Sequence, residues 1–156
     1  MKVSELLNPA VVISDLKSDK KEEVINELID LFKNDSRVSD IEKVRDAVLE
    51  REKIMSTGVG KGFAIPHGKT NSITDIIAAF GRARRPVDYN ALDNQPVHLV
   101  FLLVGKDNLV SKHIKLLSRI SRMMNKDEFR NKLLDAGSVD EILSIFQKEE
   151  ESYFDV

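Results

Sequence analysis

The sequence predicts an α/β domain in which helices cover a central sheet, and the order of hydrophobic patterns along the chain supports that fold class. Helical periodicity occupies both ends, at residues 20–33, 39–51 and 111–124. Strand-like apolar runs occupy the middle, at 76–80 and 97–104. Helices on either side of a strand-rich centre favour a layered α/β arrangement. The chain has 156 residues and shows no internal repeat or linker, which predicts one domain.

The N-terminal part of the chain is expected to form a short strand and two amphipathic helices. Residues 11–13 are apolar and β-branched, which is typical of a strand. Asp19 and Ser39 each precede a glutamate by three residues, the spacing of a capping box. They are therefore the predicted N-caps of helices 20–33 and 39–51.

The middle of the chain supplies the predicted strands of the sheet. Residues 76–80 read as a strand that ends in a basic segment, and 86–96, which has a proline at each end, reads as a loop. The eight apolar residues 97–104 are too few for a typical helix and suit a strand buried on both faces. Residues 111–124 then return to helical spacing.

Short helices and an acidic tail are expected to close the chain. Gly137 is placed to end one helix, and Ser138, with a glutamate three residues later, is placed to begin another. The acidic segment from Glu149 onward has little apolar surface to bury and is expected to fray. We therefore assign the domain to residues 1–150 and the frayed tail to 151–156.

Composition excludes several classes of function. The chain has no cysteine, which excludes a disulfide framework, thiol chemistry and zinc held by cysteine. A net charge of −2, and a basic segment Arg82–Arg85 without interleaved aromatics, argue against nucleic-acid binding. No apolar run approaches the length of a membrane span, and no signal peptide is visible at the N-terminus. We expect a cytoplasmic protein without membrane insertion.

The densest chemical signal lies in residues 51–70, which hold four of the seven glycines and His67. Nucleotide-binding loops do not fit this segment, because Phe63 stands where both the Walker A and the dinucleotide patterns need glycine. A three-histidine zinc site is also disfavoured, since His67, His98 and His113 lack the spacing of a ligand pair. We expect no metal and no cofactor.

A histidine nucleophile fits the segment better. A neutral imidazole can accept a phosphoryl group covalently, and such a transfer needs mainly positioning and an anion hole. Arg51 can pair with phosphate oxygens, and nearby hydroxyls and glycine amides can donate to them. The alternatives are that His67 is a solvated loop histidine and that the hydroxyls merely cap a turn. The expected phosphate-binding residues are Ser56, Thr57, Gly58 and Gly68.

The string Gly62–Gly68 (GFAIPHG) resembles the active-site signature of the type 2 EIIA domains of the bacterial sugar phosphotransferase system. This is the mannitol/fructose family, which includes a nitrogen-regulatory branch. Arg51-Glu52 upstream, and the segments 96–103 and 113–117 downstream, resemble further family motifs at matching separation. The resemblance thus extends over essentially the whole chain.

This resemblance implies a mixed β-sheet flanked by helices on both faces and a phosphocarrier role. His67 falls on the family's phosphoryl acceptor, which receives the group from the carrier HPr and passes it to a cysteine of an EIIB partner. His113 falls on the second active-site histidine, which stabilises the phosphoryl group, and Arg51 on the active-site arginine. In the nitrogen branch, the phosphorylation state instead selects regulatory protein partners. The resemblance implies no metal.

Overall fold

A five-stranded mixed sheet forms the centre of the computed structural model, which describes residues 2–154. The strand order is β1-β4-β5-β2, and β3 also pairs with β5. Only β4 and β5 run antiparallel to each other. The strands are β1 Val12–Ile13, β2 Phe63–Ala64, β3 His67–Lys69, β4 Ile77–Val87 and β5 Val97–Gly105.

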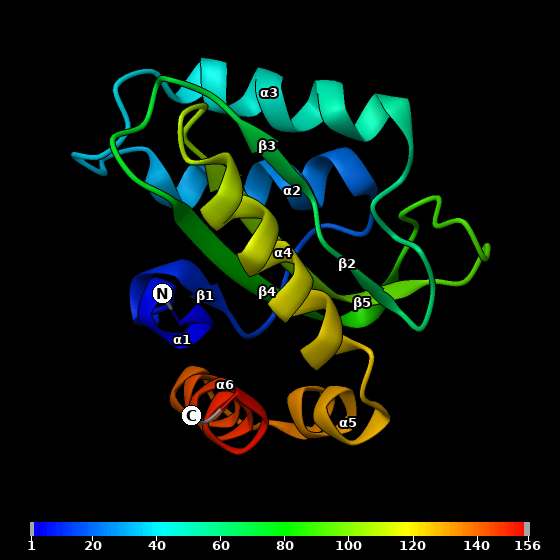
Figure 1. Cartoon of the computed structure of the whole chain (residues 1–156). Coiled ribbons are helices and arrows are strands. Elements are labelled where there is room, and N and C mark those ends of the chain that lie inside the picture. Colours follow the sequence, from blue (N-terminus) through cyan, green and yellow to red (C-terminus); the bar gives the residue numbers. More distant parts are fainter. Residues whose placement is uncertain (1, 155–156) are drawn as a thin grey trace.

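Helices cover both faces of this sheet, which confirms the predicted fold class. In Figure 1, α4 crosses in front of the sheet and α2 lies behind it, while α3 packs along β3. Helices α1, α5 and α6 lie together below the sheet in the same view. The helices are α1 Val3–Leu6, α2 Lys21–Ile29, α3 Ile41–Ile54, α4 Val110–Met124, α5 Asp127–Asp135 and α6 Val139–Phe154, with short 3₁₀ turns at Pro9–Val11 and Asp30–Phe32.

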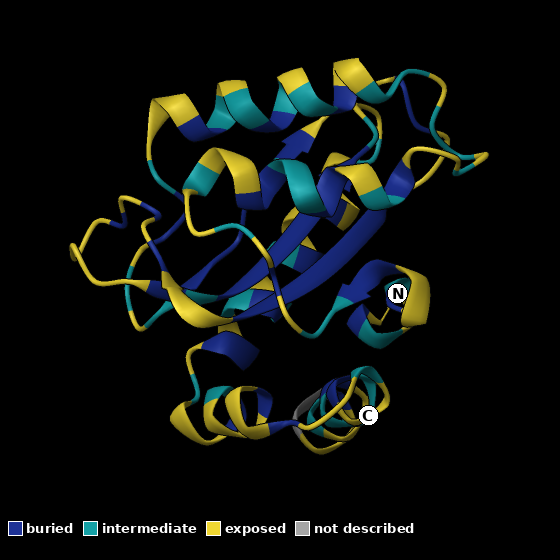
Figure 2. Ribbon diagram, turned by 180° about the vertical axis from the view of Figure 1, so that it is seen from behind, coloured by how far each residue is buried: buried dark blue, intermediate teal, exposed yellow. Residues whose placement is uncertain are grey.

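Strand β5 is the buried axis of the core, as its uninterrupted apolar run predicts. Of its nine residues all but His98 are buried, and Figure 2 shows the sheet as the least exposed layer. Phe146 of α6 packs on Phe80 and Phe101 of the sheet and on Phe129 of α5, with ring centroids 5.0 to 5.8 Å apart. These tilted and edge-on contacts fix the C-terminal helices to the sheet.

Two predicted N-caps, Asp19 and Ser39, are wrong, because each helix begins one residue later than predicted. The N-cap of α3 is Asp40, whose carboxylate accepts from the amides of Glu42 and Lys43. Ser39, the predicted cap, donates its hydroxyl to the carbonyl of Ser72 instead. Helix α2 begins after Lys20 and has no side-chain cap.

Strand β4 is longer than predicted and extends into the expected loop. It pairs with β5 as far as Arg82 opposite Leu99, and after an irregularity it pairs again at Val87 opposite Val97. The arginines interrupt the apolar pattern from which the strand was predicted. The backbone of β5 still forms hydrogen bonds with this segment, because those bonds do not depend on the side chain.

The boundary of the acidic tail at Glu149 is wrong, because α6 continues to Phe154. Glu150 is buried and accepts hydrogen bonds from the backbone of Val3 and from the backbone and hydroxyl of Ser4. That contact holds α1, which the sequence did not predict. Fraying of residues 151–156 stays a prediction, and 155–156 lie outside the described residues. Within residues 2–154, no helix is both long and apolar enough to cross a membrane.

Candidate active site

His67 begins strand β3 and stands on the rim of the sheet, half-buried. The strand is held by pairing with β5, where His67 lies opposite Leu103 and the carbonyl of Pro66 accepts from the Leu103 amide. The ring Nδ1 lies 2.8 Å from the carbonyl oxygen of Ile65. A carbonyl can only accept, so Nδ1 carries the proton and the free lone pair is on Nε2. His67 is therefore oriented as an Nε2 nucleophile.

His113 approaches His67 from the first turns of α4. The two ring centroids are 5.9 Å apart, and the rings are tilted by 54°. His113 is 3% exposed, and neither of its ring nitrogens has a hydrogen-bond partner among the described residues. Buried polar atoms are rarely left unpaired without a functional reason. An anion held between the two rings would satisfy His113.

Gly105, at the end of β5, provides the space that the His113 ring occupies. A Cβ atom built on Gly105 would lie 2.3 Å from Nδ1 of His113, which is far inside van der Waals contact. The sequence analysis did not single out Gly105. The only signal in the sequence is that a glycine ends the apolar strand, which is compatible with close approach of another group.

Burial keeps both histidines neutral at physiological pH. It lowers the pKa of His67, and the charges of Arg51 and Lys69 lower it further, although the hydrogen bond to Ile65 opposes this. Burial, together with His67 and Lys69, lowers the pKa of His113 to about 4. The neutral imidazole is the form that can attack phosphorus.

Arg51 supplies positive charge from the last turn of α3, as predicted. Its Nη1 donates to the carbonyl of Met55 at 2.8 Å, so the half-buried Arg51 closes the helix end. Its positive charge contributes to the lowering of the His67 pKa. The structure thus brings the rings of His67 and His113 together and leaves Arg51 within electrostatic range of His67.

The two predicted hydroxyls are engaged within the turn that follows α3. The Ser56 hydroxyl oxygen accepts from the Gly58 amide at 3.2 Å. The Thr57 hydroxyl donates to the Glu52 carboxylate at 2.6 Å and lies 2.9 Å from the Tyr89 hydroxyl. Both contacts correspond to the turn-capping alternative, and phosphate binding by these side chains stays a prediction.

The two predicted glycines lie where other groups approach the backbone. A Cβ on Gly68 would meet the α3 backbone at Ala47 and Val48 at 3.0 Å, and one on Gly58 would meet the Tyr89 ring at 2.9 Å. Both glycines therefore serve packing around the site. Phosphate contacts from their amides also stay a prediction.

Sequence reasoning missed the buried carboxylate that organises this turn. Glu52 is 6% exposed, accepts from the Thr57 amide at 2.8 Å and from the Tyr89 hydroxyl at 3.2 Å, and pairs with Lys21 at 3.1 Å. A signal was present, because Glu52 continues the inward i, i+4 stripe of Val44 and Val48. An acidic residue on such a stripe needs buried partners.

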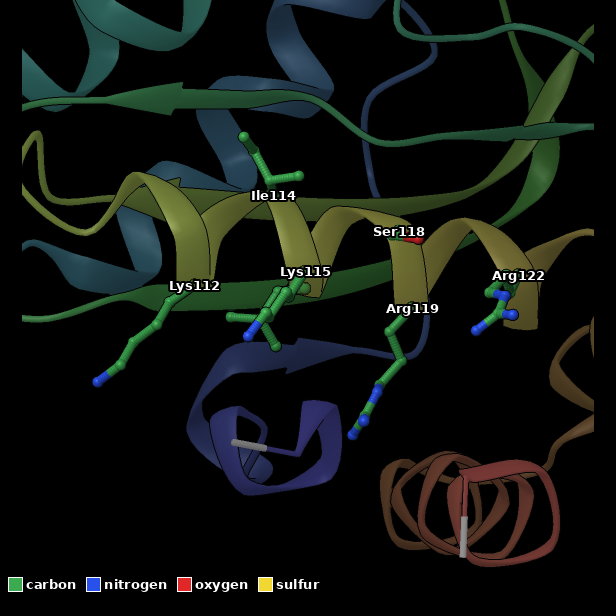
Figure 3. Close-up of a pocket in the computed structure, with 7 residues that line it drawn as sticks. Lys112, Ile114, Lys115, Ser118, Arg119 and Arg122 are labelled. Carbon is green, nitrogen blue, oxygen red and sulfur yellow. The ribbon is translucent and has the colours of Figure 1, made fainter.

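Helix α4 also shapes the surroundings of the site. Ile114 follows His113 and projects from one side of the helix, whereas Lys112, Lys115 and Arg119 project from the other (Figure 3). The basic side chains line a surface pocket of about 430 Å³. The site thus has an apolar neighbour on one flank and positive charge on the other.

Comparisons with known proteins agree with this arrangement. Residues 5–149 match the family model of the phosphoenolpyruvate-dependent sugar phosphotransferase system, EIIA 2. The chain is 38% identical over 148 residues to the fructose-specific EIIABC component of Bacillus subtilis, covering 95% of this chain but 23% of that protein. It is 34% identical over 149 residues to a nitrogen regulatory protein of Bradyrhizobium diazoefficiens, covering 93% of this chain and 94% of that protein.

Solved structures give the same picture of the fold. Nitrogen regulatory protein IIA-Ntr from Neisseria meningitidis superposes with a TM-score of 0.86 at 30% identity, covering 92% of this chain and 98% of that one. The Escherichia coli complex of mannitol enzyme IIA with phosphorylated enzyme IIB matches with a TM-score of 0.77 at 21% identity, covering 91% of this chain and 97% of that chain. The second likeness supports the fold alone.

Proposed function

This chain belongs to the EIIA type 2 family of the phosphoenolpyruvate-dependent sugar phosphotransferase system, and we propose that it is a phosphocarrier that holds a phosphoryl group on Nε2 of His67. The observation that carries the proposal is the pairing of a free Nε2 on His67 with a buried, unpartnered His113 ring 5.9 Å away. In the transfer, the lone pair of Nε2 forms the new P–N bond while the P–N bond of a donor phosphohistidine breaks. The donor ring recovers its electron pair.

The residues around His67 would stabilise the phosphoryl oxygens. Arg51 and Lys69 contribute positive charge, which opposes the negative charge of the transferred group. His113 is neutral before transfer and has one ring N–H without an acceptor. That N–H can donate to a phosphoryl oxygen, so the ring gains the partner that it lacks in the free protein.

The rim of the site supports a protein partner rather than a small substrate. Contiguous exposed apolar patches often mark surfaces that bind another protein. Among the described residues, six of the seven large exposed apolar side chains lie at the end of α3 or in the turn after it, in the loop that contacts this turn, or at the start of α4: Ile54, Met55, Val59, Leu92, Val110 and Ile114. Phospho-HPr is the proposed donor and an EIIB domain the proposed acceptor.

Intact-protein mass spectrometry tests the carrier function. The chain is incubated with phosphoenolpyruvate, the general phosphotransferase enzyme and HPr. We expect one acid-labile phosphoryl adduct, which His67→Ala abolishes and the matched control His98→Ala retains. An adduct of unchanged yield on His67→Ala would disprove the assignment of the acceptor.

The final acceptor distinguishes two branches of the family. Transfer to a fructose- or mannitol-type EIIB would make the chain a component of sugar uptake. A regulatory role is the second candidate, because a nitrogen regulatory protein matches over 94% of its own length. On that reading, the phosphorylated chain would retain its phosphoryl group in the presence of such EIIB domains and would bind a regulatory protein in only one of its two states.

A further inference from the structure

Arg82 is an anomaly in the core, because it is a buried cation without an acidic partner. It lies in β4 and is 1% exposed. Its Nε donates to the carbonyl of Ser14 at 3.0 Å, and its Nη1 donates to the carbonyls of Leu133 at 3.0 Å and of Ala136. Within residues 2–154, no carboxylate forms a hydrogen bond or ion pair with it, and Nη2 has no partner.

The carbonyl contacts compensate the charge only in part. The Ser14 carbonyl directly follows β1, and the Leu133 carbonyl lies at the C-terminal end of α5, where helix carbonyls carry partial negative charge. Burial and the neighbouring Arg84 lower the pKa of Arg82, while Asp15 and Glu141 act only through space. A buried charge is usually paired, because removal from water costs several kcal/mol. Arg82 therefore has nearby carboxylates but none in direct contact.

Arg82 also lines a surface pocket of about 270 Å³ together with Ala83, Arg84, His98 and Leu134. Arg84 is exposed and has no hydrogen-bond or ion-pair partner among the described residues. The Nδ1 of His98 donates to the Ala83 carbonyl at 2.9 Å, so Nε2 of the neutral ring bears a lone pair and cannot donate to an anion. The guanidinium pair beside a small apolar wall is the part of this surface that suits an anion.

We propose that this pocket binds the phosphate or carboxylate group of a small anionic molecule. Arg84 contacts the anion, and the buried charge of Arg82, which water screens weakly, attracts it from beneath. Binding would bring a negative charge close to Arg82. We call the pocket lined by Arg82, Arg84 and His98 the anion pocket.

The anion pocket is separate from the candidate active site. His98 lies near the start of β5 and Gly105, which contacts His113, lies at its end. Seven residues of strand span about 23 Å. The anion pocket and the phosphoryl site therefore occupy opposite ends of one rigid strand, and an anion at the first does not require chemistry at the second.

Nuclear magnetic resonance titration of the ¹⁵N-labelled chain tests the proposal, with inorganic phosphate and malonate as separate probes and chloride as the reference. We expect saturable shifts of the amides of Ala83, His98 and Leu134. Arg84→Ala should weaken binding about tenfold, whereas Arg85→Ala, the matched neighbour, should leave it unchanged. The stronger probe identifies the group, phosphate or carboxylate.

Two outcomes would overturn the proposal. One is the absence of saturable shifts at these amides up to about 20 mM of either probe. The other is equal binding by the parent chain and Arg84→Ala, which would leave Arg82 as a cap of α5 only. Arg82 itself is unsuitable for the test, because its loss can unfold the chain. Phosphorylation of His67 in Arg84→Ala is expected to be normal, so this result is independent of the carrier function.

Discussion

At the residue scale, the site depends on two neutral imidazoles of opposite hydrogen-bonding state. His67 has its Nδ1 proton fixed on the Ile65 carbonyl, which directs the lone pair of Nε2 outward. His113 has no hydrogen-bond partner among the described residues. In the mechanism that we propose, the first ring forms a bond with phosphorus and the second donates to a phosphoryl oxygen. In the free protein, the buried His113 ring without a hydrogen bond lowers the stability of the folded state.

The free energy of unfolding should decrease as the pH is lowered, because His113 is protonated more readily in the unfolded chain than in the folded chain. Its pKa is lowered from about 6.5 to about 4 in the folded chain, so the unfolded state binds more protons between these values. The folded chain with neutral His113 has its full stability above about pH 6.5, and it loses stability as the pH falls towards 4. Each pKa unit corresponds to about 1.4 kcal/mol, which gives a loss of up to about 3 kcal/mol.

Urea unfolding at about pH 7.5, 5.5 and 4.5 measures this effect. The His113→Asn variant should lose less stability than the parent over that range, because it lacks the imidazole. The carboxylates titrate equally in both proteins and cancel in the comparison. Parallel pH profiles for the two proteins would show that His113 titrates normally.

Gly105→Ala should displace the His113 ring, because the new methyl group overlaps Nδ1. We expect phosphoryl transfer to slow by about tenfold or more, since misplaced groups reduce rates steeply, with a loss of about 1–3 kcal/mol in stability. Rapid-quench measurement of transfer from phospho-HPr gives the rate. Gly137→Ala is the control, because its nearest neighbour would be a flexible Glu141 oxygen at 3.4 Å. Equal rates for both variants would contradict this account of Gly105.

At the element scale, helix α3 is the support of the site. Its last turn places Arg51 outward, and it directs Glu52 into a buried network with Thr57, Tyr89 and Lys21. The helix also packs on β3, which carries His67, and Gly68 allows that close approach. Positions of the nucleophile, the arginine and the turn therefore depend on one another.

Glu52→Ala should destabilise the chain by about 3 kcal/mol, because it leaves the Thr57 amide and the Lys21 ammonium without their acceptor. Glu50→Ala, on the same helix, removes an exposed pair with Lys53 and should cost less than about 1 kcal/mol. Thermal unfolding of both variants measures the difference. Similar losses would mean that the buried network contributes little.

The elements were predictable from sequence where a pattern repeats over several residues. Strand 97–104 and helix 111–124 appear within a residue of their predicted bounds, because many apolar positions define them. Single-residue features were less predictable. Ser39 bonds to Ser72 across the fold, and Glu52 finds partners on three other segments. Such contacts join residues distant in sequence, so local spacing does not reveal them.

The same distinction holds within the site. His67, His113 and Arg51 were predicted through their motifs, and the structure brings the two rings together and leaves Arg51 within electrostatic range of His67. The role of Gly105 was not predicted, since it depends on the distance between β5 and α4. The turn hydroxyls were predicted either to donate hydrogen bonds to phosphate or to cap the turn. Only the folded chain shows that the Thr57 hydroxyl donates to the Glu52 carboxylate.

At the scale of the whole molecule, the two ends of the chain are joined beside the helix that carries His113. Glu150 of α6 accepts from the amides of Val3 and Ser4, and it pairs with Arg119 of α4 at 3.4 Å. Its carboxylate is the point where α1, α4 and α6 meet. The position of α4, and with it that of His113, is thereby coupled to the chain ends.

Glu150→Ala should lower the free energy of unfolding by about 2 kcal/mol, because three donors lose a buried acceptor. Glu151→Ala is the control, since that side chain is exposed one residue later on the same helix. Urea unfolding monitors both variants. An equal effect of the two substitutions would mean that α1 is not held by Glu150.

The most direct test of the central claim is the identity of the phosphorylated ring atom. The chain, labelled with ¹⁵N in its histidines, is phosphorylated through phospho-HPr, and long-range ¹H–¹⁵N correlation spectra of the imidazoles are recorded. Our account predicts one phosphohistidine, on Nε2 of His67, with Nδ1 still protonated by its bond to Ile65. A phosphoryl group on Nδ1, on another residue, or on no histidine would contradict it.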